Sequence, residues 1–178
     1  MYGWKRKIHR QTGFHVQRTP LLARQRTLHQ IAYLFNYAGQ PWKTQREVRH
    51  IMETEYLNAP GGLSGNDDAG QMSAWYVFSA MGFYPVCPGT PYYIIGSPSF
   101  PRMSIRLENG KTFTILAHNA NKKNIYIQSA KLNGKEYDKN YFTHQDIIQG
   151  GTLEFQMGPN PNTNWGASAL SLPPDNMK

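Results

Sequence analysis

The spacing of the hydrophobic positions changes near residue 84. From residue 29 to residue 84 the apolar side chains recur at intervals of three and four, and beyond residue 84 they alternate with polar ones. The first pattern is typical of helices that bury one face, and the second of strands that bury one face of a sheet. The sequence therefore predicts an α+β chain, with helices in residues 29–84 followed by an antiparallel β region in residues 85–178.

Three helices are expected in the first part. One covers residues 29–38 and ends before Pro41, because proline cannot continue a helix. A second begins at a capping box formed by Thr44 and Glu47. The third covers about residues 70–81, and a glycine that suits a helix C-terminus follows it.

About six strands are expected in the second part. Asn109-Gly110 and Asn133-Gly134 are the dipeptides that type I′ hairpin turns favour. Thr143 and Asp146 have the spacing of a capping box for one turn of helix. The clearest strand patterns are YYIIG, MSIRL, TFTIL, IYIQSAKL and LEFQM.

The net charge of +8 is concentrated at the N-terminus. Residues 1–28 hold seven basic residues and no acidic one, whereas the remaining 150 residues hold 12 basic and 11 acidic ones. The body of the chain is therefore near neutral, and we expect no nucleic-acid partner. No apolar run has the length of a membrane helix, so we expect no membrane partner. Cys87 is the single cysteine and excludes a disulfide framework.

The stretch GNDDAG, residues 65–70, carries the clearest candidate chemistry. Asp67 and Asp68 stand between glycines just before the third predicted helix. Glycine lets a backbone approach a ligand closely, and a helix N-terminus stabilises the ionised form of a carboxylate. Such a pair suits a general base or the binding of calcium. The alternative is a structural role, in which Asp68 caps the helix and Asp67 faces water.

Aromatic residues flank this loop in the sequence. Aromatic faces beside carboxylates are typical of sugar-binding sites, but aromatic residues at helical spacing are more often part of a core. We assign Trp75 and Phe78 to the core, which leaves Trp42 as a candidate for sugar binding. The histidines at positions 50, 118 and 144 do not have the spacing of metal ligands, so no metal-binding set can be named.

Four stretches of the chain together resemble the C-terminal part of glycoside hydrolase family 92. The resemblance covers about residues 29–166. Members of this family are calcium-dependent, exo-acting α-mannosidases that invert the anomeric centre. The stretches are HQIAYLFNYAGQPWKTQ, GGLSGNDDAGQMSAWYVFSAMGFYPVCPG, YIIGSPSF and LNGKEYDKNYFTHQDIIQGGTLEFQMGPNPNTNWG.

The resemblance implies a fold and a set of site residues. The chain would contain the last helices of an (α/α)6 toroid, followed by the antiparallel β region. The family loop commonly reads G-D-E-D-x-G, which implies catalytic roles for Asp68 and Asp67. It implies substrate binding by Asn66, Trp42 and His29, although Asn66 stands where the family has an acid. Calcium would bind the O2 and O3 hydroxyls of mannose in the intact enzyme.

Residues 1–28 depart from the family. Its members carry H-G-N-E-P-S-H where this chain has A-R-Q-R-T-L-H. The stretch Arg24–Leu28 can be encoded by codons that, read one base later, spell Gly-Asn-Glu-Pro-Ser. Our hypothesis is that residues 1–28 are an out-of-frame reading of a family 92 gene and form a non-native or disordered segment.

These observations predict a fragment of an inverting exo-α-mannosidase of the α-1,2 type. Its substrates would be terminal mannose residues of N-glycans or mannans, and the fragment would be inactive alone. Its partner would be the missing upstream part of the enzyme. The alternative is a non-catalytic carbohydrate-binding β module in residues 85–178. Family members are typically exported, to the periplasm, the outer membrane or the medium.

Overall fold

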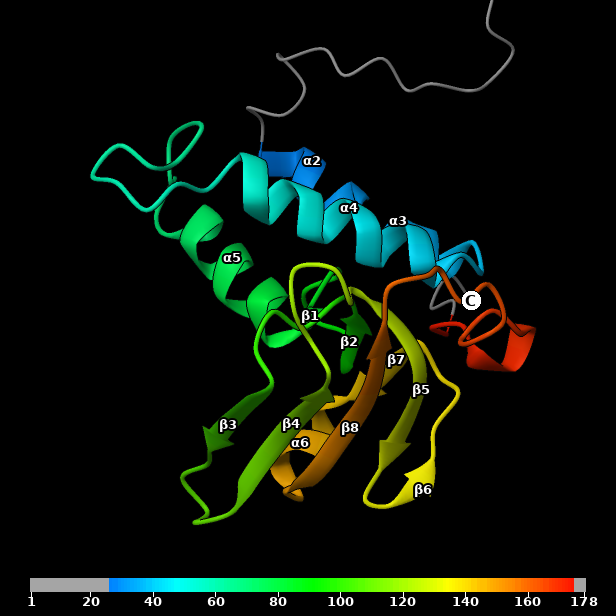
Figure 1. The fold of residues 1–178 in the computed structure, drawn as a ribbon. Helices are drawn as coiled ribbons and strands as arrows, with labels where there is room; N and C mark the ends of the chain where they lie inside the picture. Colours follow the sequence, from blue (N-terminus) through cyan, green and yellow to red (C-terminus); the bar gives the residue numbers. More distant parts are fainter. Residues whose placement is uncertain (1–25, 175–178) are drawn as a thin grey trace, which may run out of the picture.

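The computed structural model describes residues 26–174, and its helices lie across one end of a β region (Figure 1). The predicted non-native segment, residues 1–28, therefore lies almost wholly outside the described residues. The helices of the first part are α2 (Arg26–Ile31), α3 (Leu34–Tyr37), α4 (Pro41–Thr54) and α5 (Gln71–Met81). Two further helices follow, α6 (His144–Ile148) and the 3₁₀ helix η1 (Ala169–Ser171).

The first predicted helix is divided into α2 and α3 by a turn at residues 32–33. This turn allows two side chains to point into the protein. The Tyr33 hydroxyl lies 2.9 Å from that of Ser79, and the amide of Asn36 contacts the backbone of the β region. Ile31 and Leu34 are about half exposed, although their spacing is that of a helix face that is normally buried.

Helix α4 begins earlier than predicted. Pro41 is its first residue, because proline has no N–H group to leave without a partner at that position. The predicted capping box is wrong. Thr44 is buried and donates a hydrogen bond to the carbonyl of Ala32 at 2.9 Å, while Glu47 accepts one from Arg46.

The β region contains two sheets. The smaller has the order β1-β2-β7, with β1 (Phe83–Tyr84), β2 (Tyr92–Ile95) and β7 (Tyr141–Thr143). The larger has the order β3-β4-β8-β5-β6, with β3 (Arg102–Arg106), β4 (Thr112–His118), β5 (Tyr126–Leu132), β6 (Lys135–Glu136) and β8 (Gly151–Gly158). The α+β class is confirmed. The strands are not all antiparallel, however, because β4 pairs with β8 in parallel.

One of the two predicted type I′ turns is present and the other is not. Asn133 and Gly134 have φ values of +52° and +79°, and they join β5 to β6 as a type I′ turn requires. At the other dipeptide only Gly110 has a positive φ, +78°, so that turn is not of type I′. The capping box of α6 is confirmed, since the Asp146 N–H donates to the Thr143 hydroxyl at 3.2 Å.

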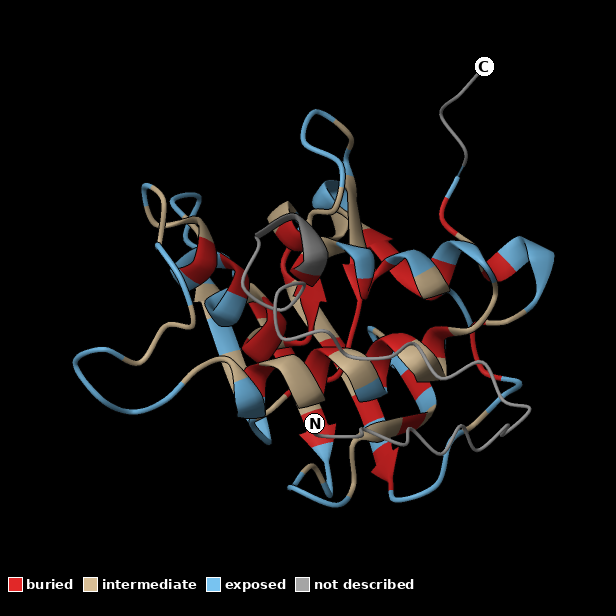
Figure 2. Ribbon diagram, turned by 90° about the horizontal axis from the view of Figure 1, so that it is seen from above, coloured by how far each residue is buried: buried red, intermediate tan, exposed pale blue. Residues whose placement is uncertain are grey.

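Both the helices and the strands contribute buried residues to the core (Figure 2). One apolar cluster lies within the β region and includes Phe113, Phe142 and Leu153. The other joins the helices to β2 and β7, with Trp75 at its centre and Ile94 among its members. Among the described residues, no helix has both the length and the apolar character needed to cross a membrane.

Two buried asparagines connect the helical layer to the strands. Asn36 donates from Nδ2 to the carbonyls of Ile95 and Asn140, both at 2.9 Å. Asn140 donates from Nδ2 to the carbonyls of Asn36 at 3.0 Å and Gly166 at 2.7 Å. Since both side chains are fully buried, these amides satisfy carbonyl groups that water cannot reach.

Candidate functional site

The GNDDAG loop lies at the N-terminal end of α5, and the segment that contains it extends away from the β region (Figure 1). Three successive residues have left-handed backbone conformations: Asp68 with φ +48°, Ala69 with φ +61° and Gly70 with φ +86°. Such a conformation is unfavourable for alanine and is tolerated better by aspartate and glycine. The loop therefore depends on contacts with its surroundings.

Asp67 supplies the contact that closes the loop onto α5. Its Oδ1 accepts a hydrogen bond from the Ser73 N–H at 2.9 Å, and its Oδ2 accepts one from the Ser73 hydroxyl at 2.8 Å. Ser73 is the third residue of α5, so this bond satisfies one of the free N–H groups at the helix start. In the alternative, structural interpretation Asp68 would cap the helix, but in the structure Asp67 binds the N–H group at the helix start.

The two acids consequently differ in their surroundings. The backbone N–H of Ser73, and then its hydroxyl, lower the pKa of Asp67 below its ordinary value. A carboxylate held in this way is a weak base. Asp68 is partly exposed on the strained part of the loop, and Asn66 is exposed two residues before it.

A titration tests this difference. We expect the pKa of the Asp67 carboxyl, measured by carbon-detected NMR, to lie below the ordinary aspartate value of 3.8. The pKa is lowered in the folded state, so this stabilisation is complete above the unfolded pKa and is lost as the pH falls through the folded value. Ser73→Ala should raise the Asp67 pKa because it removes one of the two hydrogen bonds. Ser73→Thr keeps the hydroxyl and should leave the pKa low; equal values in both variants would contradict the contact.

An aromatic cluster supports the start of α5. Trp75 is 2% exposed and stacks on Tyr56, with ring centroids 5.8 Å apart and planes inclined by 12°. The Tyr56 hydroxyl donates to the carbonyl of Met72 at 3.1 Å. Burial raises the pKa of Tyr56, and the charge of Asp67 raises it further. Tyr56 therefore stays protonated and joins the cluster to the loop.

His29 belongs to this cluster. Its ring centroid lies 4.8 Å from that of Trp75, and its Nδ1 lies 3.2 Å from the Tyr56 hydroxyl. The structure thus brings His29 close to the start of α5. The side chain is 2% exposed, however, so it forms part of the support beneath the loop and is closed to solvent.

Trp42 lies elsewhere. It is the second residue of α4, whereas the loop follows the C-terminal end of that helix, roughly 18 Å away at 1.5 Å per residue. Its ring faces the Lys43 ammonium at 5.3 Å and the Arg46 guanidinium at 5.6 Å. Within the described residues, Trp42 is not brought together with Asp67 and Asp68.

Sequence reasoning missed two residues of this region, Ser73 and Tyr56. The spacing of Ser73, six positions after Asp67, does not match a capping box, because the left-handed residues between them lengthen the loop. Tyr56 has no local signal, because its partners come from α2 and α5. Both roles depend on the folded path of the chain.

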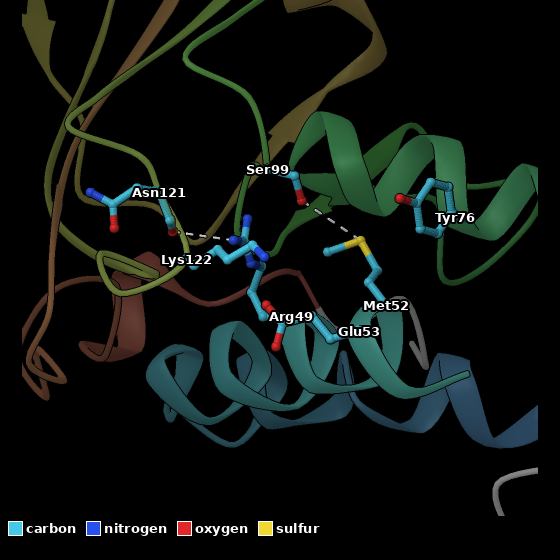
Figure 3. A pocket seen from close by; sticks show the side chains of 7 residues that line it. All are labelled: Arg49, Met52, Glu53, Tyr76, Ser99, Asn121 and Lys122. Atoms are coloured by element: carbon cyan, nitrogen blue, oxygen red, sulfur yellow. Dashed lines mark hydrogen bonds between the residues drawn. The ribbon is translucent and has the colours of Figure 1, made fainter. Parts of the chain in front are cut away.

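A hollow of about 340 Å³ lies between α4, α5 and residues 121–122 (Figure 3). Arg49 is buried at its edge and donates to the carbonyls of Pro98 at 3.1 Å and Asn121 at 3.2 Å. This side chain therefore ties α4 to two loops of the β region. Tyr76 borders the hollow from α5, and its ring lies 4.9 Å from that of Tyr56.

The described residues do not form a calcium site. Residues 26–174 contain no group of three histidine, cysteine, aspartate or glutamate side chains that could hold a metal ion. Each carboxylate oxygen of Asp67 accepts a hydrogen bond from Ser73. The carboxylates of residues 26–174 thus do not by themselves complete a calcium site.

Comparisons with known proteins identify relatives. The sequence model of the glycosyl hydrolase family 92 catalytic domain matches residues 15–159. An uncharacterized secreted glycosidase from Arthroderma benhamiae is 37% identical over 145 residues, which cover 80% of this chain and 19% of that protein. The match to the family begins within residues 1–28, and the out-of-frame origin of that segment stays a hypothesis.

Solved structures of family GH92 enzymes are also similar to this chain. The family GH92 α-mannosidase BT3965 from Bacteroides thetaiotaomicron is 46% identical, with a TM-score of 0.80, over 84% of this chain and 20% of that one. It has also been solved with mannoimidazole. The inverting mannosidase BT2199 from the same organism is 46% identical, with a TM-score of 0.78, over 82% and 20%. The chain thus spans about a fifth of the length of these relatives.

Proposed function

Since this chain belongs to glycosyl hydrolase family 92, we propose that it is part of an inverting exo-α-mannosidase. The proposed reaction removes terminal mannose from N-glycans or mannans, with α-1,2 linkages as substrate. The observation that carries the proposal is the 46% identity to a family GH92 α-mannosidase over 84% of the chain. The complex of that relative with mannoimidazole supports mannose-containing glycans as the substrate class. The secreted relative supports export of the intact enzyme.

We assign the role of general base to Asp68 within this proposal. Asp67 is better suited to hold the loop than to accept a proton, since Ser73 occupies its two oxygens. Asn66 is exposed beside them and could bind a sugar hydroxyl. An inverting glycosidase also needs an acid roughly 6.5–9.5 Å from the base, with room for water between them. We propose that this acid comes from polypeptide outside this chain.

Calcium belongs to the proposal for the intact enzyme only. Bound calcium would polarise and orient the sugar hydroxyls.

An activity assay tests the proposed function. We expect no hydrolysis of α-1,2-mannobiose by this chain alone, with or without calcium, because the acid is missing. Addition of the BT3965 polypeptide without its aligned fifth should restore hydrolysis. Asp68→Asn should then lower kcat by about 10²–10⁴-fold, the usual contribution of a general base.

The control for this assay is Asp146→Asn, because Asp146 caps α6 in the β region. It should leave kcat of the reconstituted enzyme unchanged. Hydrolysis that is insensitive to Asp68→Asn would remove Asp68 from the mechanism. Mannose binding by the chain alone that maps to residues 85–178 would instead support the carbohydrate-binding module.

A further inference from the structure

Helix α5 carries no charged residue in its eleven positions. A helix that is apolar or uncharged on every side is typical of a protein interior, because a surface helix has a polar face. The structure covers only one side of α5. Met72, Trp75 and Ser79 are buried against the rest of the chain.

The other side of α5 is open. Ser73, Ala74, Tyr76 and Val77 are exposed there, and Val77 is 56% exposed. We refer to these four residues as the outer face of α5. Isolated exposed apolar residues are common, but a whole helical face without a charge is more typical of a surface that packs against protein.

Helix α4 provides the contrast within the same layer. Its less buried positions include Lys43, Arg46, Glu47 and Glu53, and it buries Val48 and Met52. This is the pattern of a helix with one side in water. The absence of charge on α5 therefore distinguishes it from α4, the other long helix of this layer.

We infer that the outer face of α5 binds the part of a family 92 polypeptide that this chain does not contain. The inference rests on the proposed function. About four-fifths of the length of the relatives lies outside the aligned region, so an occupant of the required size exists in the family. The occupant would present an uncharged, largely apolar surface to Ala74 and Val77.

The outer face of α5 extends to the candidate site. Ser73 belongs to it and holds Asp67 through both carboxylate oxygens. A polypeptide packed on Ala74 and Val77 would reach the loop within one helical turn, since residues three and four apart lie on the same side of a helix. It would enclose the surroundings of Asp68 and stand where an acid could face that carboxylate, with room for the reacting water between them. The interface and the catalytic site would therefore form together.

A binding experiment tests this interface. The probe is the BT3965 polypeptide without its aligned fifth, titrated with this chain by isothermal calorimetry in the absence of sugar. Val77→Lys should weaken binding at least about tenfold, because a charge would enter the apolar contact. The control is Gln156→Lys, which adds the same charge on the exposed side of β8. Equal affinity of the two variants would overturn the inference.

Three further results keep the inference testable. The isolated Val77→Lys chain should be at least as stable as the original, since lysine favours a helix more than valine does. In intact BT3965, lysine at the position aligned with Val77 should lower the melting temperature, whether or not the truncated probe folds; an unchanged value would overturn the inference. Self-association of this chain that Val77→Lys abolishes would identify a second copy as the occupant, which also contradicts it.

These outcomes distinguish a failure of the interface from a failure of the proposed function. A complex that forms and depends on Val77 but does not hydrolyse mannosides would support the interface and reject the mannosidase. Hydrolysis that survives Val77→Lys without loss would support the mannosidase and reject the interface.

Discussion

Trp75→Ala is expected to lower the free energy of unfolding by about 3–5 kcal/mol, the usual range for removing a buried tryptophan. Trp75 is 2% exposed and its ring lies among those of His29, Tyr33, Tyr56 and Tyr84. Its Nε1 has no hydrogen-bond partner among the described residues, so the loss comes from packing. Urea denaturation followed by circular dichroism measures it.

Two variants serve as controls. Trp75→Phe keeps an aromatic ring in the cluster and should cost clearly less than Trp75→Ala. Trp42→Ala removes a half-buried ring at the other end of the helical layer and should cost no more than about 1–2 kcal/mol. If Trp42→Ala were the more destabilising change, the centre of the helical core would have to be assigned to α4 and not to α5.

Asn36→Ala is expected to have the second-largest effect on the free energy of unfolding, a loss of about 1–3 kcal/mol. It removes the donor to the buried carbonyls of Ile95 and Asn140, although the Asn140 carbonyl keeps a hydrogen bond from the Ile95 N–H. A buried group left without a partner costs roughly 1–3 kcal/mol. The helical layer should also detach more readily from the strands. Hydrogen exchange of the backbone amides in α2 and α3 should therefore accelerate more than exchange in β4 and β8.

Asn160→Ala is the matched control for this prediction. Asn160 is exposed, and only its backbone carbonyl takes part in a described hydrogen bond, from Gln128. Its substitution should change the free energy of unfolding by less than about 0.5 kcal/mol. Uniform acceleration of exchange through the whole molecule in Asn36→Ala would show that the asparagine pair does not act locally.

The sequence predicted the elements that depend on local pattern. The helix of residues 71–81 and the strand patterns were found because their burial follows the period of the element itself. The helix of residues 29–38 was predicted as continuous. It is divided because Tyr33 and Asn36 form hydrogen bonds with Ser79 and with the strands, and such distant partners leave no local pattern in the sequence. The parallel pairing of β4 with β8 joins residues about forty positions apart, and no local pattern encodes it.

The candidate site shows the same limit. The sequence located the acids in the correct loop, at the start of α5. The alternative interpretation had Asp68 as the capping residue, whereas the left-handed path of residues 68–70 brings the Asp67 carboxylate to Ser73. His29 is buried beneath the loop, and Trp42 lies far from it at the opposite end of α4. Spacing alone could not give either result.

The position of β8 has a consequence for the synthesis of the protein. β8 is the last strand to leave the ribosome, yet it occupies the centre of the larger sheet, between β4 and β5. Until residue 158 has emerged, β4 and β5 each present an unpaired edge, and such edges promote association with other chains. The sheet therefore closes only after β8 has emerged, and a nascent chain halted before residue 151 would expose both edges to its neighbours.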